Sequence, residues 1–256
     1  MIKKQTKWFR GTSNYAPIVA LILIFAIWEG SIRIFNIPQS VLPSLFLIFK
    51  TLITKFTTVF GIHLWYTFRT VLIGMLVGVP IGIIIGAIVS QISWIGRITY
   101  PYIIALVTIP MVAILPILMF WVGFGMPARV IVVICQVVPI VTLQSLTGFN
   151  TIERNKVNLG LSVGASTFTR FIKIVFPNAL PYVFTGMRLG SIFATTATIS
   201  AELVSSSEGL GNRVTYFSKI VATDYTFSCI FLIAAIGVTV YTIISVLEKK
   251  ITVWKS

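Results

Sequence analysis

Charged residues are scarce in this chain. Only 10% of its 256 residues are charged and only 6 are acidic, whereas a soluble domain carries roughly 25% charged residues. Hydrophobic residues make up 57% of the sequence, and the mean hydropathy is +0.98. These values exclude an ordinary soluble domain and indicate an integral membrane protein. The net charge of +14 then fits the cytoplasmic flanks of membrane helices better than a nucleic-acid partner.

The residues from which catalytic and metal sites are built are also missing. The chain has one histidine, His63, and its two cysteines, Cys135 and Cys229, both lie in apolar runs. This excludes a multi-histidine zinc or haem site and gives no support to a disulfide framework. No glycine is followed by lysine, so the phosphate-binding loop GxxxxGK[ST] is absent. The acidic residues are scattered, which argues against a membrane enzyme, and we predict no catalytic residue, metal or cofactor.

Long apolar runs dominate what is present. A membrane helix needs about 20 mostly apolar residues, and six segments qualify: 15–35, 64–89, 100–121, 128–147, 182–204 and 226–247. Only helices and closed barrels can span lipid, and these runs are too uniformly apolar for barrel strands, which alternate over about 10 residues. The expected fold is all-α, a polytopic membrane helical bundle of six transmembrane helices in a single domain over residues 1–256.

The distribution of Lys and Arg predicts the orientation. With the N-terminus inside, thirteen of the 20 basic residues fall in inside regions, as the positive-inside rule requires. We therefore predict that both termini are cytoplasmic, and that the first apolar run is an uncleaved helix, because no small-x-small cleavage site follows it. Residues 38–62 lie outside in this topology, and their helical period predicts a short helix at the outer surface.

Several side chains have predicted partners. Glycines recur every fourth residue on one face of the second span, which predicts close packing within the subunit, with a subunit contact as the alternative; they are Gly74, Gly78, Gly82 and Gly86. Glu29 and Arg33 are four residues apart and predict a local ion pair. Prolines at 101, 110 and 116 predict bends in the third span.

One polar face is the candidate translocation path. Ser191, Thr195, Thr198 and Glu202 share a face of the fifth span, and an ionisable group inside a span usually faces the bundle interior or a water-filled path. A structural stripe, with Glu202 near Arg213 at the outer interface, is the alternative. Gln136, in the middle of the fourth span, either lines the same path or bonds a neighbouring helix.

The segment from 149 to about 180 is polar and basic, and the topology puts it inside. Gly160 and Gly164 break helices, and Ser162 and Ser166 are good helix N-caps. We expect two short helices with a turn at Gly164. A cytoplasmic segment of about 30 residues is long for a connection, which favours a docking role.

This segment resembles the cytoplasmic "EAA" loop with which bacterial ABC-importer permeases dock on a separate ATPase. The family pattern is Glu-Ala-Ala, three residues, Gly, nine residues, then Ile-x-Leu-Pro. Gly164, Ile174 and Pro177 match that spacing, whereas Phe176 replaces the Leu and Asn158-Leu159-Gly160 replaces Glu-Ala-Ala. The resemblance implies a coupling helix over 159–169. It assigns ATPase coupling to Asn158, Leu159, Gly160, Gly164, Ala165, Ser166, Ile174 and Pro177.

Further segments are similar to the nitrate/sulfonate/taurine branch of these binding-protein-dependent permeases. They are Trp28-Glu29, Val41-Leu42-Pro43-Ser44, Ile109-Pro110, Leu115-Pro116-Ile117-Leu118, Trp121-Val-Gly123-Phe-Gly125, Ala201-Glu202 and Gly209-Leu210-Gly211. The resemblance implies a type I ABC-importer permease in a bacterial inner or plasma membrane. Its implied partners are a second permease copy, an ATP-binding subunit in two copies, membrane lipid and an extracytoplasmic solute-binding protein. ATP hydrolysis would take place on the partner chain.

The branch resemblance implies a small anionic solute of the alkanesulfonate, taurine or nitrate type. Arg129 and Arg213 fall at outer ends of the expected spans, where cations could attract an anion. Related permeases carry thiamine precursors or other heterocycles, so a heterocyclic solute is the alternative. A stand-alone secondary transporter is less favoured, because no internal repeat joins the two halves of the chain.

Overall fold

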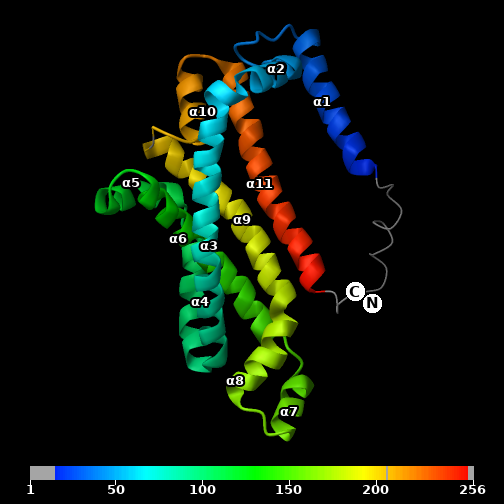
Figure 1. Ribbon diagram of the computed structural model, residues 1–256, viewed down its shortest axis with the longest axis vertical. Coiled ribbons are helices and arrows are strands. Elements are labelled where there is room, and N and C mark those ends of the chain that lie inside the picture. The colour runs from blue at the N-terminus through cyan, green and yellow to red at the C-terminus, as the bar shows by residue number, and fades with distance from the viewer. Residues whose placement is uncertain (1–14, 206, 253–256) are drawn as a thin grey trace.

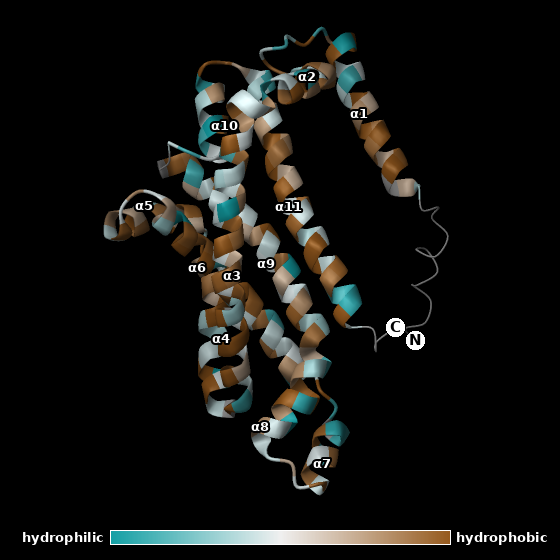
Figure 2. Cartoon of the chain, viewed as in Figure 1, coloured by the Kyte–Doolittle hydropathy of each residue, from teal (hydrophilic) through white to brown (hydrophobic). Residues whose placement is uncertain are grey.

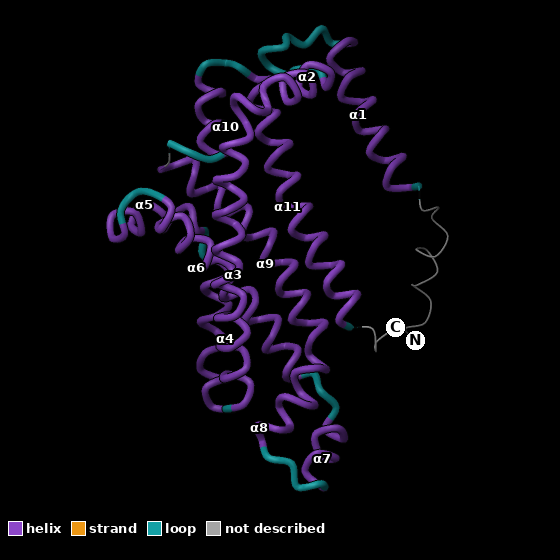
Figure 3. The backbone as a smooth tube through the Cα atoms, viewed as in Figure 1, coloured by secondary structure: helices purple, strands orange, loops and turns teal. Residues whose placement is uncertain are grey.

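Helices make up every regular element that the structure describes. The computed structural model describes residues 15–205 and 207–252, and short loops join its helices (Figure 3). In chain order these are α1 (Ala16–Ile34), α2 (Leu45–Lys55), η1 (Phe56–Phe60), α3 (Gly61–Gln91), α4 (Ser93–Thr108), α5 (Met111–Val122), α6 (Met126–Asn150), α7 (Arg154–Ser162), α8 (Thr167–Arg170), η2 (Phe171–Val175), α9 (Phe176–Ser205), α10 (Leu210–Lys219) and α11 (Thr223–Ile251). The predicted all-α class is confirmed. The basic residues of 1–14 and 253–256, which the orientation prediction counts, lie outside the described residues.

Helices α3, α6 and α9 form the centre of the bundle, with α6 packed against both of the others. The glycine face of α3 makes the α3–α6 contact possible. A Cβ atom added at Gly78 would lie 3.1 Å from the Cβ of Val137, and one at Gly82 would lie 2.8 Å from the Cβ of Val141. Gly74 and Gly86 meet α6 in the same way. The predicted close packing within the subunit is confirmed, because only a residue without a side chain lets the two backbones approach this closely.

The third apolar run is not one continuous helix. It is divided between α4 and α5, which are bent by 93° relative to each other. Ile109 has an extended backbone (φ −68°, ψ 122°) because it precedes Pro110, and a proline disfavours the helical conformation in the residue before it. The bend expected from proline therefore becomes a break, and α5 leaves the bundle sideways (Figure 1).

The expected count of six spans is not confirmed. Three helical segments of the described chain are long and apolar enough to cross a membrane. They are Leu45–Gln91, which is the continuous run of α2, η1 and α3, together with Met126–Asn150 (α6) and Thr223–Ile251 (α11). The bent α4–α5 pair makes up to four. Helices α1 and α9, the counterparts of the first and fifth expected spans, do not combine the length and apolar character needed to be counted. At 30 residues, α9 is long enough to span, but Arg188, Glu202 and its many hydroxyl residues lower its hydropathy (Figure 2).

Two of the quoted sequence segments meet where α1 joins α2. The indole Nε1 of Trp28 donates to the carbonyl of Pro43 at 3.1 Å, and a carboxylate oxygen of Glu29 accepts the N–H of Leu45 at 3.3 Å. Ser44 caps the start of α2 by accepting the N–H of Leu47. The predicted pair of Glu29 with Arg33 is confirmed at 3.4 Å. The predicted short helix exists as α2, and it lies across the end of the bundle opposite α7 and α8 (Figure 1).

Candidate functional site

The segment between α6 and α9 forms a helical hairpin at one end of the molecule (Figure 1). Gly164 has φ +69°, the left-handed conformation that glycine adopts without cost. Its N–H donates to the carbonyl of Leu161, and the N–H of Ala165 donates to the carbonyl of Gly160, both at 3.0 Å. This is a Schellman C-cap for α7. Ser166 then caps α8 by accepting the N–H of Thr169 at 3.2 Å, so the expected pair of short helices with a turn at Gly164 is confirmed.

The hairpin is fixed to the central helices. Gly160 is buried, and a Cβ there would lie 2.9 Å from Ile174, so α7 rests directly against η2. Next to this contact, Phe149 of α6 packs against Phe171 and Phe176. Its ring centroid lies 5.2 Å from that of Phe171 and 6.3 Å from that of Phe176. Phe176 thus occupies the position of the family's leucine as part of an aromatic cluster. Phe149 and Phe171 were not predicted from the sequence as members of this site.

The outer side of the hairpin is unusually apolar. Val163, Phe168 and Leu159 are 75%, 73% and 68% exposed, and Leu161 and Ile172 are about half exposed. Exposed apolar side chains gathered on a short hairpin are typical of a contact surface for a protein or a membrane.

The predicted coupling residues come together in this hairpin, with one difference in shape. Residues 159–169 do not form a single helix, because the Gly164 turn separates α7 from α8. Asn158, Leu159 and Ser166 are exposed, whereas Gly160 is buried and Ile174 and Pro177 are half-buried. Pro177 is the second residue of α9, directly after the π-helical segment η2.

A second polar cluster lies at the opposite end, around a fully buried carboxylate. Both oxygens of Glu202 lie 2.9 Å from the hydroxyl of Thr67 on α3, and Oε2 accepts the N–H of Gly211 at 2.9 Å. The Arg129 guanidinium on α6 is 3.8 Å from Oε1. Three elements, α3, α6 and α10, therefore converge on one side chain of α9. A buried carboxylate is tolerated only with such partners.

The glycines of the Gly209-Leu210-Gly211 segment are required by this carboxylate. Gly209 has φ +96°, and a Cβ there would overlap the carboxylate of Glu202. A Cβ at Gly211 would lie 2.8 Å from the Cβ of Glu202. The N–H of Leu210 donates to Thr67 at 2.9 Å. The start of α10 is thus folded onto Glu202, which explains why Ala201-Glu202 is followed by this glycine pair.

The two outer arginines are engaged within the chain. Arg129 is only 3% exposed and also approaches Glu208, at 3.5 Å. Arg213 donates through Nε to Nε2 of His63 at 2.8 Å. The expectation that Glu202 comes within reach of Arg213 is therefore corrected: its basic partner is Arg129. Arg129 therefore meets two carboxylates inside the chain, whereas Arg213 is hydrogen-bonded to His63. The importance of Arg129 and Thr67 to this cluster was not predicted from the sequence.

The hydroxyl residues of the candidate path are packed inside the chain. Ser191, Thr195 and Thr198 are buried, and each donates to a carbonyl of α9 itself, at 2.7, 2.9 and 2.8 Å. Gln136 is 8% exposed, and within the described chain its amide has no hydrogen-bond partner. The assignment of these residues to the translocation path stays a prediction. Gln136 is the member of the set whose side-chain amide has no hydrogen-bond partner within the described chain.

A family comparison agrees with this geometry. Residues 78–253 match the family model described as the binding-protein-dependent transport system inner membrane component. The chain belongs to this family. It is a membrane-spanning permease subunit of an ABC importer, a transport component rather than an enzyme.

Relatives and a solved structure extend the comparison. The chain is 27% identical over 93% of its length to the formylaminopyrimidine transport permease ThiX of Halalkalibacterium halodurans, covering 95% of that protein. It is 27% identical over 57% of its length to the taurine transport permease TauC of Escherichia coli, covering 53% of that protein. A structure described as an inward-facing conformation of the MetNI methionine ABC transporter aligns with a TM-score of 0.61 at 16% identity. It covers 82% of this chain and 98% of the other, and it supports the type I permease fold.

Proposed function

We propose that the α7–α8 hairpin of this permease docks on a separate ATP-binding subunit and transmits the movement of that subunit to α6 and α9. The exposed apolar surface of Leu159, Val163 and Phe168 carries the proposal. Its anchoring through Phe149 and Phe176 supports the second part, because a force applied to a hairpin that is packed on two long helices moves those helices as well.

The proposed assembly follows from that docking. The hairpin end is cytoplasmic, so both chain termini are cytoplasmic and the α2–α10 end faces the solute-binding protein. Two permease copies pair in a bacterial cell membrane, and each binds one ATP-binding subunit. The apolar side chains on α4 and α5, among them Trp94, Phe120 and Trp121, are available for lipid or for the second copy.

The docking proposal is tested with substitutions on the hairpin surface. Phe168→Asp places a charge in the proposed interface, whereas Phe168→Leu keeps an apolar side chain at the same position. Tagged full-length permease is purified from its native host, and the co-purifying ATP-binding subunit is identified and quantified by mass spectrometry. We expect Phe168→Asp to lose most of that subunit and Phe168→Leu to retain it. Equal recovery with Phe168→Asp would remove this surface from the interface.

The orientation is tested by labelling intact cells with a membrane-impermeant thiol reagent. Thr167 in the hairpin and Ser207 before α10 are both exposed and suit single-cysteine variants in a background without Cys135 and Cys229. Ser207→Cys should label and Thr167→Cys should label only after lysis. Thr51 is a poor reporter, because it is 7% exposed and donates to Asp224.

The proposed solute is a small oxyanion such as an alkanesulfonate, taurine or nitrate. Similarity to the taurine permease TauC supports this class. The side-chain amide of Gln136, which has no hydrogen-bond partner within the described chain, can donate hydrogen bonds to an oxyanion. A heterocyclic solute is the second candidate, because the ThiX similarity extends over 93% of the chain. Uptake of both classes in a permease deletion strain decides between them. Loss of heterocycle uptake, with sulfonate-dependent growth preserved, would overturn the first choice.

A further inference from the structure

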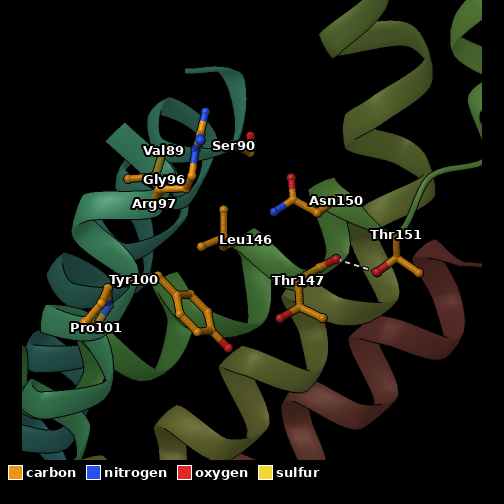
Figure 4. Close-up of a pocket in the computed structure, with 10 residues that line it drawn as sticks. All are labelled: Val89, Ser90, Gly96, Arg97, Tyr100, Pro101, Leu146, Thr147, Asn150 and Thr151. Carbon is orange, nitrogen blue, oxygen red and sulfur yellow. Dashed lines mark hydrogen bonds between the residues drawn. The ribbon is translucent and has the colours of Figure 1, made fainter. Parts of the chain in front are cut away.

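A cavity of about 720 Å³ lies at the hairpin end of the bundle, outside the sites described above. Its walls are the last turns of α3 and α6 and the first turns of α4 (Figure 4). Leu146 lies between the two sides, with Arg97 and Tyr100 on α4 and Asn150 across from them on α6 (Figure 4).

Arg97 is the only charged residue of this lining. Among the described residues it has neither an ion-pair nor a hydrogen-bond partner. The acidic residues of the chain are engaged elsewhere: Glu29 with Arg33, Glu153 with Lys156, Glu202 and Glu208 with Arg129, Asp224 with Thr51, and Glu248 with Arg188. The cavity therefore has a positive charge that the chain itself does not neutralise.

Two further side chains of the cavity carry hydrogen-bond donors that could bind a ligand. The amide of Asn150 and the hydroxyl of Tyr100 have no partner within the described chain, whereas the hydroxyls of Ser90 and Thr147 donate to carbonyls of their own helices at 2.8 Å. A guanidinium, an amide and a phenol are together the donor set for a group with several acceptor oxygens. Leu146 and Val89 add apolar surface beside them.

We propose that this cavity binds the oxyanion of an amphiphile, a phosphate or sulfonate group carried on an apolar tail. The tail would run along α4, where Trp94 and Ile98 are 63% and 57% exposed. An anionic phospholipid of the adjacent leaflet is the source that this arrangement favours, because aromatic and basic side chains at a helix end bind lipid head groups. An alkanesulfonate in solution offers the same chemistry. The donor set is independent of the transported solute; only the placement in the inner leaflet rests on the proposed topology.

Lipid retention tests the site in the full-length permease. Purified protein is incubated with phosphatidylglycerol or phosphatidylcholine in detergent, and bound lipid is measured by native mass spectrometry. The variants are Arg97→Gln, the charge-preserving Arg97→Lys, and a control, Lys249→Gln, at an exposed basic residue of α11. We expect phosphatidylglycerol to be preferred and Arg97→Gln to weaken its binding about tenfold. Arg97→Lys should restore most of the affinity, and Lys249→Gln should leave it unchanged.

A second arm distinguishes the sources. Binding of 1-octanesulfonate and of inorganic phosphate is measured on the same variants by isothermal titration. Lipid binding that depends on Arg97 supports the phospholipid source, and sulfonate binding that depends on Arg97, without lipid preference, supports the soluble source. The proposal is overturned if neither ligand shows dependence on Arg97, or if Arg97→Gln and Lys249→Gln lower binding equally. Unchanged thermal unfolding of Arg97→Gln is required in each case, and Tyr100→Phe, which removes one hydroxyl, replaces it if Arg97→Gln does not fold.

Discussion

The carboxylate of Glu202 accepts the backbone N–H of Gly211 at 2.9 Å. This bond joins the end of α9 to the start of α10, and the same carboxylate receives the hydroxyl of Thr67. Glu202 therefore works in this structure as a structural acceptor at the end of the bundle. The cluster also explains why Gly209 and Gly211 occur together, since a side chain at either position would collide with Glu202.

Replacing Glu202 by Gln should destabilise the permease. The amide keeps the shape but presents N–H groups where Thr67 and Gly211 already donate, so at least one buried donor loses its acceptor, and Arg129 loses its ion-pair partner. Such a loss costs about 1–3 kcal/mol, and the midpoint of thermal unfolding in detergent should fall. Glu208→Gln, at the other and more exposed carboxylate beside Arg129, is the control and should have the smaller effect. Lost uptake at an unchanged midpoint would instead favour the pathway role.

The Gly164 turn makes a prediction about backbone conformation alone. No atom lies within 4 Å of a Cβ added at Gly164, so the effect of a substitution comes from its φ of +69°. Gly164→Val should distort the hairpin and reduce co-purification of the ATP-binding subunit and uptake, because a β-branched residue avoids this region. Gly164→Asn should retain most of both activities, since Asn tolerates it. Equal loss in the two variants would mean that the side chain, and not the turn, is what the partner rejects.

Features that depend on neighbouring residues in the chain were predictable from the sequence, whereas contacts between residues far apart in the chain were not. The glycine face of α3 and the turn at Gly164 could be predicted because each depends on spacing within one helix or on one residue's conformational freedom. The partner of Glu202 was assigned wrongly, because Arg129 lies 73 positions away in sequence and only the packing of α6 against α9 brings them together. Likewise, Phe149 and Phe171 meet only because the hairpin folds back.

The third span shows a different limit. The apolar composition of this span correctly indicated a helix, and its prolines indicated a bend, but neither feature determines how large the bend is. The break depends on Ile109 and Pro110 together, as the extended residue and the missing N–H fall at the same point. The fifth expected span is helical, as α9, but polar side chains lower its hydropathy, and several of them are satisfied by carbonyls of α9 itself or by the Glu202 cluster.

The α3–α6 contact predicts a contrast between two glycines. In Gly82→Ala the new methyl would lie 2.8 Å from Val141 and 2.9 Å from the carbonyl of Val138. The backbone atom cannot swing aside, so we expect a loss of about 1–3 kcal/mol of stability. Gly30→Ala in α1 meets nothing within 4 Å and should be neutral or slightly stabilising. The two unfolding midpoints, measured in the same detergent, test this; equal shifts would contradict the packing argument.

Arg188 of α9 and Glu248 of α11 form an ion pair, with side chains 22% and 17% exposed. Either charge reversal places two like charges side by side in a site that is mostly shielded from solvent, and we expect Arg188→Glu and Glu248→Arg each to lower stability by about 1–3 kcal/mol. The double variant, with the charges exchanged, should recover much of that loss because the opposite charges meet again. Unfolding midpoints of the four proteins form a charge-exchange cycle, in which the recovery of stability in the double variant shows whether the two side chains interact. Arg188 also donates to Thr185 at 3.0 Å, so complete recovery is not expected. A double variant no more stable than the worse single variant would show that the pair does not hold α11 to α9.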